Sequence, residues 1–342
     1  MQSLHFIRYL LPVLLSTAFV IVSEVGYFYL ILPLLFAANI FNAYWGEFTA
    51  SEIKMELRHF YGSKESKIIK RVSGILLAAL VIWSVIFYFR QDFSMGAAAL
   101  FTLCTGCLTG CFVVTLAHDL MHSNRRIDQL ISGLLLLMAG IPYMAADHVV
   151  GHHRMVGLAE DTNTAKINQN FYSYFVRLFI DRISNSYFNG YDLPVYLKKK
   201  ILQLNLLMLF LQVFIWVAIY LFFSGPVMIF FIAQGLIAYF LYELINYVQH
   251  YGLSRSHAGQ QISMHSSWNC YYKYTNYILY MLPLHSLHHL PTASRKLTGI
   301  DLKSGPKLPY LYFVMVFMAL IPSLWFRKMN TLALQFNQQN AF

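Results

Sequence analysis

Residues 226–252, "PVMIFFIAQGLIAYFLYELINYVQHYG", combine a long apolar run with a histidine at its end. The hydrocarbon core of a bilayer is about 30 Å thick, and a helix needs about 20 apolar residues to cross it. Residues 226–248 meet that requirement, and His250 follows where the run ends. Ionisable side chains at a membrane are costly and usually mark functional sites. This stretch therefore predicts a membrane-spanning helix with a functional histidine at one end.

Apolar runs of this kind recur throughout the protein. It has 342 residues, of which 58% are hydrophobic and 12% are charged, whereas soluble domains are roughly 45–50% apolar. This composition predicts an all-α integral membrane protein. Two weaker stretches, 130–146 and 308–325, are short or broken by prolines, and we interpret them as partly inserted or interfacial. Six stretches are long enough to span the membrane, at about 7–22, 27–44, 71–90, 96–117, 201–223 and 226–248.

The basic residues predict the orientation of these spans. Six crossings place both termini on one side, and with the N-terminus inside, Arg90 is the only one of the 25 lysines and arginines that falls outside. Cytoplasmic loops of membrane proteins carry an excess of lysine and arginine. We predict a single membrane-embedded domain over residues 1–342 with cytoplasmic termini and a cytoplasmic cap from 45–70, 118–200 and 249–342. The net charge of +10 fits this orientation and contact with anionic lipid rather than with nucleic acid.

Nine of the 13 histidines fall in four clusters on the predicted cytoplasmic side. Residues three or four apart share one face of a helix, so each cluster with two or more histidines can present several imidazoles together. The clusters are "HDLMH" with His118 and His122, "DHVVGHH" with His148, His152 and His153, "NYVQHYG" with His250, and "HSLHH" with His285, His288 and His289. The other four, His5, His59, His257 and His265, are interpreted as surface residues.

This set of imidazoles predicts a metal site. Imidazole suits zinc, copper, iron and nickel, and a single zinc is satisfied by three or four ligands. Nine histidines therefore indicate two ions of a redox metal with open coordination positions. Iron is favoured because nitrogen ligands leave the metal centre cationic and able to bind O₂. Polar side chains that accept the second ring N–H should orient the ligands. The candidates for that role are Asp119, Asp147, Glu160, Asp161, Glu243 and Asn246, although capping or solvated roles stay open for the acids outside the spans.

With these motifs in place, the protein resembles the membrane-bound non-haem di-iron alkane monooxygenases of the fatty acid desaturase and hydroxylase superfamily. That family carries H-E-L-x-H-K, E-H-x-x-G-H-H, N-Y-x-E-H-Y-G-L-x-R and L-Q-R-H-x-D-H-H boxes. This sequence has "HDLMHS", "DHVVGHHRMVGLAEDTNTA", "NYVQHYGLSR" and "LPLHSLHHLPTASRK" in the same order. The departures, with Asp119 and Asp147 in place of glutamate and Gln249 in place of an acid, retain every histidine and bear on the substrate.

The resemblance implies that all nine histidines bind a pair of iron ions and that the enzyme hydroxylates a terminal or activated C–H bond with O₂. It also implies that a rubredoxin or ferredoxin, reduced by an NAD(P)H-dependent reductase, supplies the electrons. The protein would lie in the bacterial inner membrane. The sequence has no flavin, nicotinamide or iron–sulfur motif of its own. An acidic carrier would suit the basic cytoplasmic face, and lipid headgroups are the alternative partner for its candidate docking residues, Arg125, Arg126 and Lys198 to Lys200.

Several alternatives stay open at this stage. A membrane acyl desaturase has H-x-x-x-H, H-x-x-H-H and H-x-x-H-H boxes, but here the middle box is spaced H-x-x-x-H-H and the H-Y-G motif favours hydroxylation. An intramembrane zinc protease built on "HDLMH" would leave seven histidines without a role. A metal transporter would place its ligands near the bilayer midplane rather than at helix ends. The sequence also leaves the substrate class open among n-alkanes, fatty acids or esters, aryl methyl groups and terpenes.

Overall fold

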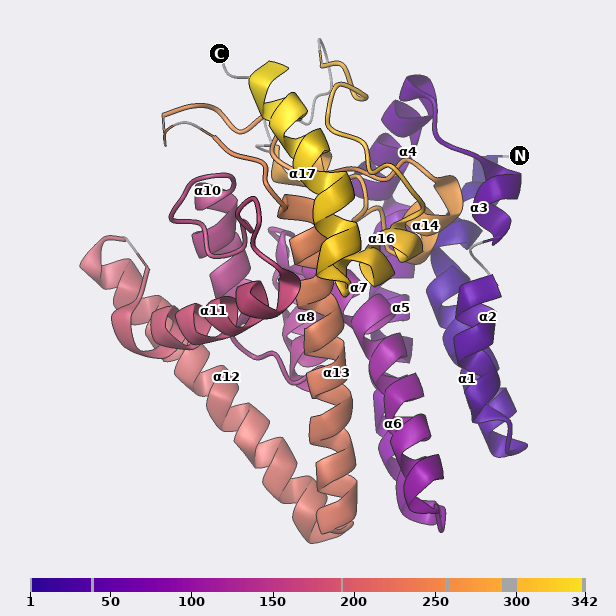
Figure 1. Cartoon of the computed structure of the whole chain (residues 1–342). Coiled ribbons are helices and arrows are strands. Elements are labelled where there is room, and N and C mark those ends of the chain that lie inside the picture. Colours follow the sequence, from indigo (N-terminus) through magenta and orange to yellow (C-terminus); the bar gives the residue numbers. More distant parts are fainter. Residues whose placement is uncertain are drawn as a thin grey trace.

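The computed structural model describes residues 2–37, 40–191, 193–255, 257, 259–290 and 300–339. Within these ranges the protein is helical and forms no β-strand beyond isolated bridges, which confirms the all-α prediction. Long helices run side by side through a bundle, and shorter helices gather over one end of it (Figure 1). Residues 291–299, which include the end of the "LPLHSLHHLPTASRK" motif, lie outside the described residues.

Six candidate membrane spans are present among the described residues, as predicted. Most extend beyond the apolar stretch because the helix continues into polar residues at one end. The third span begins at Lys64 rather than at residue 71, and the sixth ends at His250. The spans are Phe6–Glu24, Phe28–Trp45, Lys64–Arg90, Met95–Met121, Val195–Phe222 and Gly225–His250.

These spans are built from the long helices of Figure 1. The fourth span is a composite, in which α6 (Met95–Leu108) passes through a π-helical segment, η3 (Thr109–Val114), into α7 (Thr115–Met121). The other spans contain η1 (Gln2–Leu10), α1 (Leu11–Glu24), η2 (Phe28–Leu30), α2 (Ile31–Ala37), α3 (Ile40–Trp45), α5 (Lys64–Arg90), α12 (Val195–Phe222) and α13 (Gly225–His250).

The two weaker apolar stretches do not form straight spans. The first becomes α8 (Arg126–Met138), a helix of 13 residues, which is shorter than the roughly 20 residues that a crossing requires. The second divides into α16 (Tyr312–Ala319) and α17 (Pro322–Gln339), which are bent by 119° relative to each other. Proline lacks a backbone N–H and is tolerated in the first turn of a helix, so Pro322 begins a new helix at the bend.

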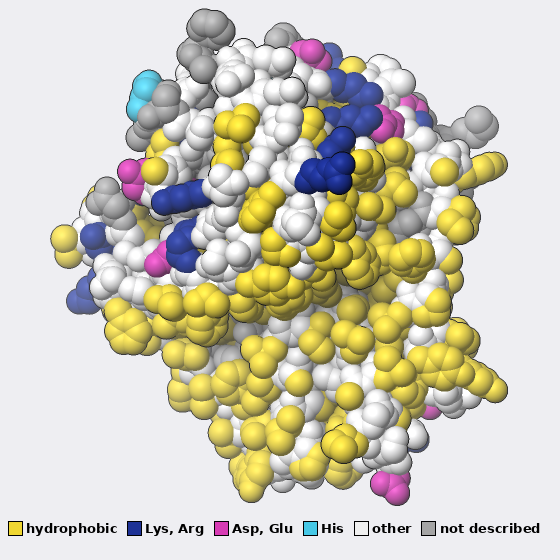
Figure 2. All heavy atoms as spheres, viewed as in Figure 1, with side chains coloured by type: hydrophobic (Ala, Val, Ile, Leu, Met, Phe, Trp, Pro, Cys, Tyr) yellow, Lys and Arg dark blue, Asp and Glu magenta, His cyan; other side chains and the backbone are white. Residues whose placement is uncertain are grey.

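The short helices and α17 form a cap at one end of the bundle, where both termini also lie (Figure 1). Figure 2 shows apolar side chains over the bundle and lysines and arginines over the cap. This separation is that of an integral membrane protein. The short cap helices are α4 (Ala50–Gly62), α9 (Met144–Ala146), η4 (Asp147–His152), α10 (His153–Met155), α11 (Phe171–Ser184), η5 (Asn185–Asn189), α14 (Lys273–Ile278) and α15 (His285–His289).

Two glycines one helical turn apart allow α6 and its π-helical extension to pack closely on α13. A Cβ atom added to Gly106 would lie 2.6 Å from the Cβ of Ile237, and one added to Gly110 would lie 3.2 Å from the Cα of Ala238. Small residues four apart permit such close backbone approach in membranes. The packing brings the histidine-bearing ends of α7 and α13 to the same end of the bundle.

This contact predicts that Gly106→Ala destabilises the protein. The added methyl group has no space beside Ile237, and overpacking of this kind costs typically about 1–3 kcal/mol. We expect a lower melting temperature for the detergent-solubilised variant than for the parent. Gly133→Ala on α8 is the matched control, because its new methyl group would meet only Met208 Cε at 3.7 Å. Equal melting temperatures for the two variants would contradict the close packing of α6 on α13.

Candidate metal centre

The nine clustered histidines lie on four segments that meet in the cap. His118 and His122 lie at the end of the fourth span, and His250 is the last residue of α13. His148 and His152 belong to the π-helical segment η4, and His153 follows directly in α10. The last cluster is α15, whose five residues include His285, His288 and His289.

Five of these histidines form a first group of facing ring nitrogens. The Nε2 atoms of His118 and His148 are 2.7 Å apart, and the Nε2 atom of His153 lies 3.0 Å from those of both His148 and His288. His122 belongs to the same group, in which one ligand atom each from His118, His122, His148 and His288 lies within 4.8 Å of the others. His122 and His153 are partly exposed, whereas the other three are buried.

The other four histidines form a second group, which is fully buried. The Nε2 atom of His250 lies 3.1 Å from that of His152 and 3.0 Å from that of His285. His289 completes the group, with its Nε2 atom 3.0 Å from that of His285. The two groups adjoin, since the ring centroids of His153 and His289 are 4.4 Å apart.

The π-helical geometry determines which histidine joins which group. Hydrogen bonds in a π-helix run from residue i to i+5, and His148 and His153 are five residues apart and share the first group. His152, four residues after His148, joins the second group. In α15, His288 likewise joins the first group, whereas His285 and His289 join the second. The "DHVVGHH" and "HSLHH" clusters therefore each contribute histidines to both groups.

The charge state of the rings fits a bound cation. Burial, reinforced by the neighbouring histidines, holds the pKa of His148, His285, His288 and His289 well below its usual range. Each neutral imidazole has a single N–H and one ring nitrogen with a lone pair. The nitrogens that converge within each group cannot all be satisfied by donating to one another. A metal about 2.1 Å from each nitrogen would separate neighbouring ligands by roughly 3.0–3.4 Å. The separations of 3.0 and 3.1 Å fall in this range, and the 2.7 Å between His118 and His148 is shorter.

Of the predicted orienting residues, Asp161 contacts a histidine ring. Its carboxylate lies 3.0 Å from Nδ1 of His152, which leaves Nε2 of that ring facing the second group. Asp161 also accepts hydrogen bonds from the Thr164 hydroxyl and from the backbone N–H of Asn163. A carboxylate that accepts the second N–H fixes the orientation and tautomer of a ligating imidazole.

The other candidates occupy different places around the centre. Asp119 forms an ion pair with Lys70 at 2.8 Å. Glu160 is exposed. Asp147, Glu243 and Asn246 are buried in one hydrogen-bonded network, in which the Asn246 amide donates to Glu243 at 3.1 Å. Their role in orienting ligands remains a prediction.

Arg182, which was not among the residues predicted from sequence, is at the centre of this network. Its side chain is 1% exposed, and its Nε lies 2.9 Å from Asp147. It also pairs with Glu243 and donates to Asn163. Asp147 directly precedes His148, Glu243 lies on the helix that ends at His250, and Asn163 lies two residues after Asp161. One guanidinium therefore connects two histidine-bearing segments with the loop that carries Asp161. The sequence did hold a signal, because Arg182 falls on the helix face defined by Phe171, Tyr174 and Leu178.

A helical membrane bundle that holds two adjoining groups of imidazoles at one end has the architecture of a membrane-embedded metalloenzyme. A family model described as "Fatty acid desaturase" matches residues 93–293. Alkane 1-monooxygenase 2 of Alcanivorax borkumensis is 28% identical over 76% of this protein and 71% of its own length. Alkane 1-monooxygenase 2 of Pseudomonas aeruginosa is 29% identical over 81% and 74%. The hydroxylase component of a Pseudomonas putida xylene/toluene monooxygenase is 27% identical over 64% and 60%.

The protein belongs to the fatty acid desaturase family, and its relatives place it among the alkane-monooxygenase-like oxidoreductases of that family. This confirms the resemblance of the histidine motifs. The histidine groups and the family together indicate a metal cofactor of the iron type.

The Arg182 network predicts that Arg182→Met impairs metal retention and stability. Removing the guanidinium would leave Asp147 and Glu243 buried without their cation, and breaking a buried ion pair costs about 3–5 kcal/mol. We expect less iron per protein molecule after purification and a lower melting temperature, with partial recovery in Arg182→Lys. The control is Arg177→Met on the same helix, because the Arg177–Asp181 pair is 31% and 40% exposed. Parental iron content in Arg182→Met would contradict a role in positioning the ligands.

The buried imidazoles predict that the metal-free protein is sensitive to acid. In the unfolded protein these rings take up protons as the pH falls through about 6.5, whereas their lowered pKa keeps them neutral in the folded state. The unfolded state then binds more protons than the folded state. The free energy of unfolding therefore decreases as the pH is lowered, by up to about 1.4 kcal/mol per pH unit for each ring. We expect the melting temperature of metal-free protein to drop between about pH 7 and about pH 5. A constant melting temperature would show that the rings are not buried and neutral.

Proposed function

We propose that this protein hydroxylates a C–H bond of an alkane or of an alkyl group at a nine-histidine di-iron centre. The observation that carries the proposal is the division of nine histidines into two adjoining groups in a protein whose relatives are named monooxygenases. Two groups suit two metal ions, and imidazole is a good ligand for iron. The cap and spans that carry these groups would form one functional domain over residues 1–342.

Two iron ions bound at these groups would supply the capacity to activate O₂. In the overall reaction one oxygen atom enters the C–H bond as an alcohol, and the other leaves as water after uptake of two electrons and two protons. The protein positions and shields the reacting groups. Burial of the second histidine group excludes water from it, and Asp161 holds His152 in a fixed orientation. The apolar spans place a hydrophobic substrate within reach by way of the membrane.

The electrons would come from an external carrier of the rubredoxin or ferredoxin type with its reductase. The first histidine group is the nearer to solvent, because His122 and His153 are the partly exposed members of the nine. A carrier docked on the cap would therefore approach this group. Arg125, Arg126 and Lys198 to Lys200 stay candidates for its docking, and this face would be cytoplasmic in a bacterial inner membrane.

Desaturation and methyl-group hydroxylation are the second candidate functions, since the family model is named for fatty acid desaturases and one relative is a xylene/toluene monooxygenase component. Both reactions would use the same pair of metal ions. They differ from alkane hydroxylation in the product, which is an alkene or a benzylic alcohol.

Product analysis tests the proposed function. Membranes that contain the protein, a rubredoxin, its reductase and NADH would be supplied with alkanes, acyl esters and alkylarenes under ¹⁸O₂. We expect an alcohol that carries one ¹⁸O atom, and His288→Ala should reduce its formation to background because one ligand of the first group is lost. His257→Ala, at an exposed position, is the control. An unlabelled product, or full activity of His288→Ala, would contradict the proposal.

A further inference from the structure

The bend between α16 and α17 leaves a groove of about 460 Å³ on the surface of the protein. The two helices meet at 119°, and the groove lies in the angle between them. Its volume is within the range of about 300–1,000 Å³ that is usual for small-molecule sites. The residues that line it are Tyr310, Val314, Met318, Leu324, Arg327 and Lys328.

The face of α17 that borders this groove is not used to pack the fold. The buried residues of α17 are Trp325, Met329 and Ala333, which are spaced four apart and form its inner face. Leu324 and Lys328 are also four apart and therefore share a different face. Leu324 is 47% exposed and Lys328 is half-buried. The outer face of the helix is thus available to a ligand.

The groove is apolar at one end and cationic at the other. Val314 and Leu324 are exposed, whereas Arg327 and Lys328 follow Leu324 about one turn later as α17 rises into the cap (Figure 1). The Nζ atom of Lys328 lies 5.3 Å from the ring centroid of Tyr310. Tyrosines, and lysines whose stems lie along apolar surface, are typical of the border of a membrane.

The position of the groove agrees with such a border. Over the region where Figure 1 draws α16 and the start of α17, Figure 2 shows apolar side chains with lysine and arginine side chains directly above them. The apolar end of the groove therefore adjoins the apolar band of the spans, and its cationic end adjoins the cap.

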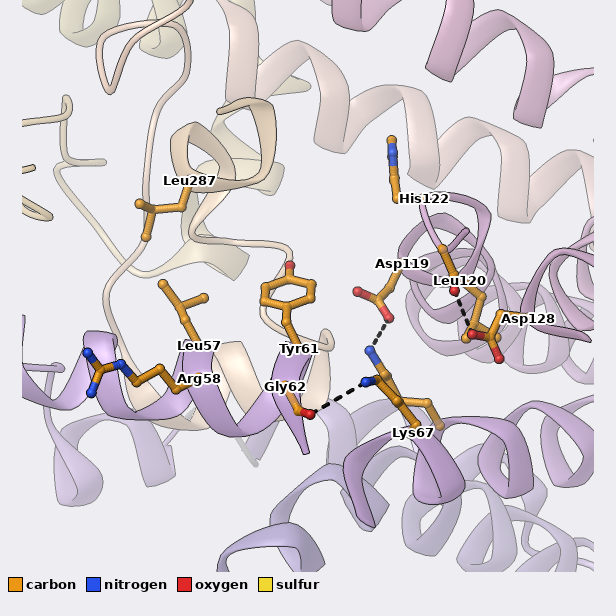
Figure 3. Close-up of a pocket in the computed structure, with 12 residues that line it drawn as sticks. Leu57, Arg58, Tyr61, Gly62, Lys67, Asp119, Leu120, His122, Asp128 and Leu287 are labelled. Atoms are coloured by element: carbon orange, nitrogen blue, oxygen red, sulfur yellow. Dashed lines mark hydrogen bonds and ion pairs between the residues drawn. The ribbon is translucent and has the colours of Figure 1, made fainter. Parts of the chain in front are cut away.

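The other large cavity of the cap has a different charge balance. It has a volume of about 440 Å³ and adjoins the first histidine group (Figure 3). Two acids line it, and both are paired with a cation. Asp119 lies 2.8 Å from Lys70, and Asp128 lies 2.6 Å from Arg71. This cavity therefore has little net attraction for an anion.

The groove between α16 and α17 carries positive charge without such compensation. Among the residues that the structure describes, no acid lines the groove, and neither Arg327 nor Lys328 has a carboxylate partner within 4.0 Å. Lysine and arginine beside a membrane attract anionic lipids and bind phosphate oxygens. Inorganic phosphate has the same anionic group, but it has no alkyl chain to cover the apolar end of the groove.

We propose that this groove is a binding site for one anionic phospholipid of the phosphatidylglycerol type. The phosphate lies against Arg327 and Lys328. An acyl chain covers the apolar residues Val314, Met318 and Leu324. The site is separate from the two histidine groups, and it does not depend on the reaction proposed for them.

A lipid in the groove would stabilise the contact of α17 with the end of α13. The ring of Trp325, on the inner face of α17, lies with its centroid 5.2 Å from that of Tyr247 and 5.3 Å from that of Tyr251. Asn330 of α17 accepts a hydrogen bond from the Tyr251 hydroxyl. These tyrosines lie on either side of His250 in the sequence. Occupation of the outer face should therefore hold α17 against the residues that flank this histidine.

Lipid titration followed by native mass spectrometry tests the site on the full-length protein, purified in detergent and freed of lipid. The probes are dioleoyl phosphatidylglycerol and dioleoyl phosphatidylcholine. We expect the first phosphatidylglycerol to bind about tenfold more tightly than phosphatidylcholine, because two cations near an anionic headgroup contribute enough for such a factor. Arg327→Gln/Lys328→Gln should weaken binding of phosphatidylglycerol about tenfold and leave binding of phosphatidylcholine unchanged.

The matched control is Arg58→Gln/Lys64→Gln, which removes an exposed arginine and an exposed lysine that do not line the groove. Arg58 lies on α4 beside the other cavity (Figure 3). The control should bind both lipids as the parent does. Equal affinity of the parent for the two lipids would overturn the proposal, as would equal weakening in the two double variants. Displacement of phosphatidylglycerol by an equal concentration of inorganic phosphate would also overturn it, because the acyl chain would then contribute nothing.

Thermal unfolding in nanodiscs tests the effect on α17. A ligand that binds the folded state raises its stability. We expect a higher melting temperature in discs that contain phosphatidylglycerol than in discs of phosphatidylcholine alone, for the parent and for Arg58→Gln/Lys64→Gln. Arg327→Gln/Lys328→Gln should show no such rise. The same rise in all three proteins would assign the effect to the overall positive charge and contradict a site in this groove.

Discussion

The convergence of imidazole nitrogens is the constraint on which the rest of the structure depends. In each group several ring nitrogens face one another at about 3 Å, and burial keeps the pKa of the rings low enough for them to be neutral. Their lone pairs are compatible with such proximity when a cation lies among them. The helices that carry these histidines must therefore end close enough together for their rings to bind the same cation. The close packing of α6 on α13 through Gly106 and Gly110 helps to bring the ends of α7 and α13 together.

The surroundings of the two groups give them different access. The first group includes the partly exposed His122 and His153 and borders the cavity that carries Arg58 and Lys67. The second group is fully buried, and the Asp161 carboxylate lies 3.0 Å from Nδ1 of its member His152. Arg182 connects segments that serve both groups, because its partner Asp147 precedes His148 and its partner Glu243 lies on the helix that ends at His250. Access from solvent therefore concentrates at the first group, while the second is shielded.

Much of this architecture could be predicted from the sequence, and the reasons for the remainder are physical. Run length alone located the six spans, since a bilayer requires a long apolar helix. Clustering identified the nine histidines that the structure brings together. The assignment of His148 and His152 to different groups required the π-helical segment η4, which spacing on an ordinary α-helix does not predict. The ion pairs of Lys70 and Arg182 join segments distant in sequence, and such pairs leave no local pattern.

The most direct measurement of the central claim is metal analysis combined with X-ray absorption spectroscopy at the iron edge on protein purified with iron. The account predicts close to two irons per protein molecule, a first shell dominated by imidazole and scattering from a second iron nearby. One metal ion per molecule, a zinc ion bound in its place, or an iron spectrum with no neighbouring iron would contradict it.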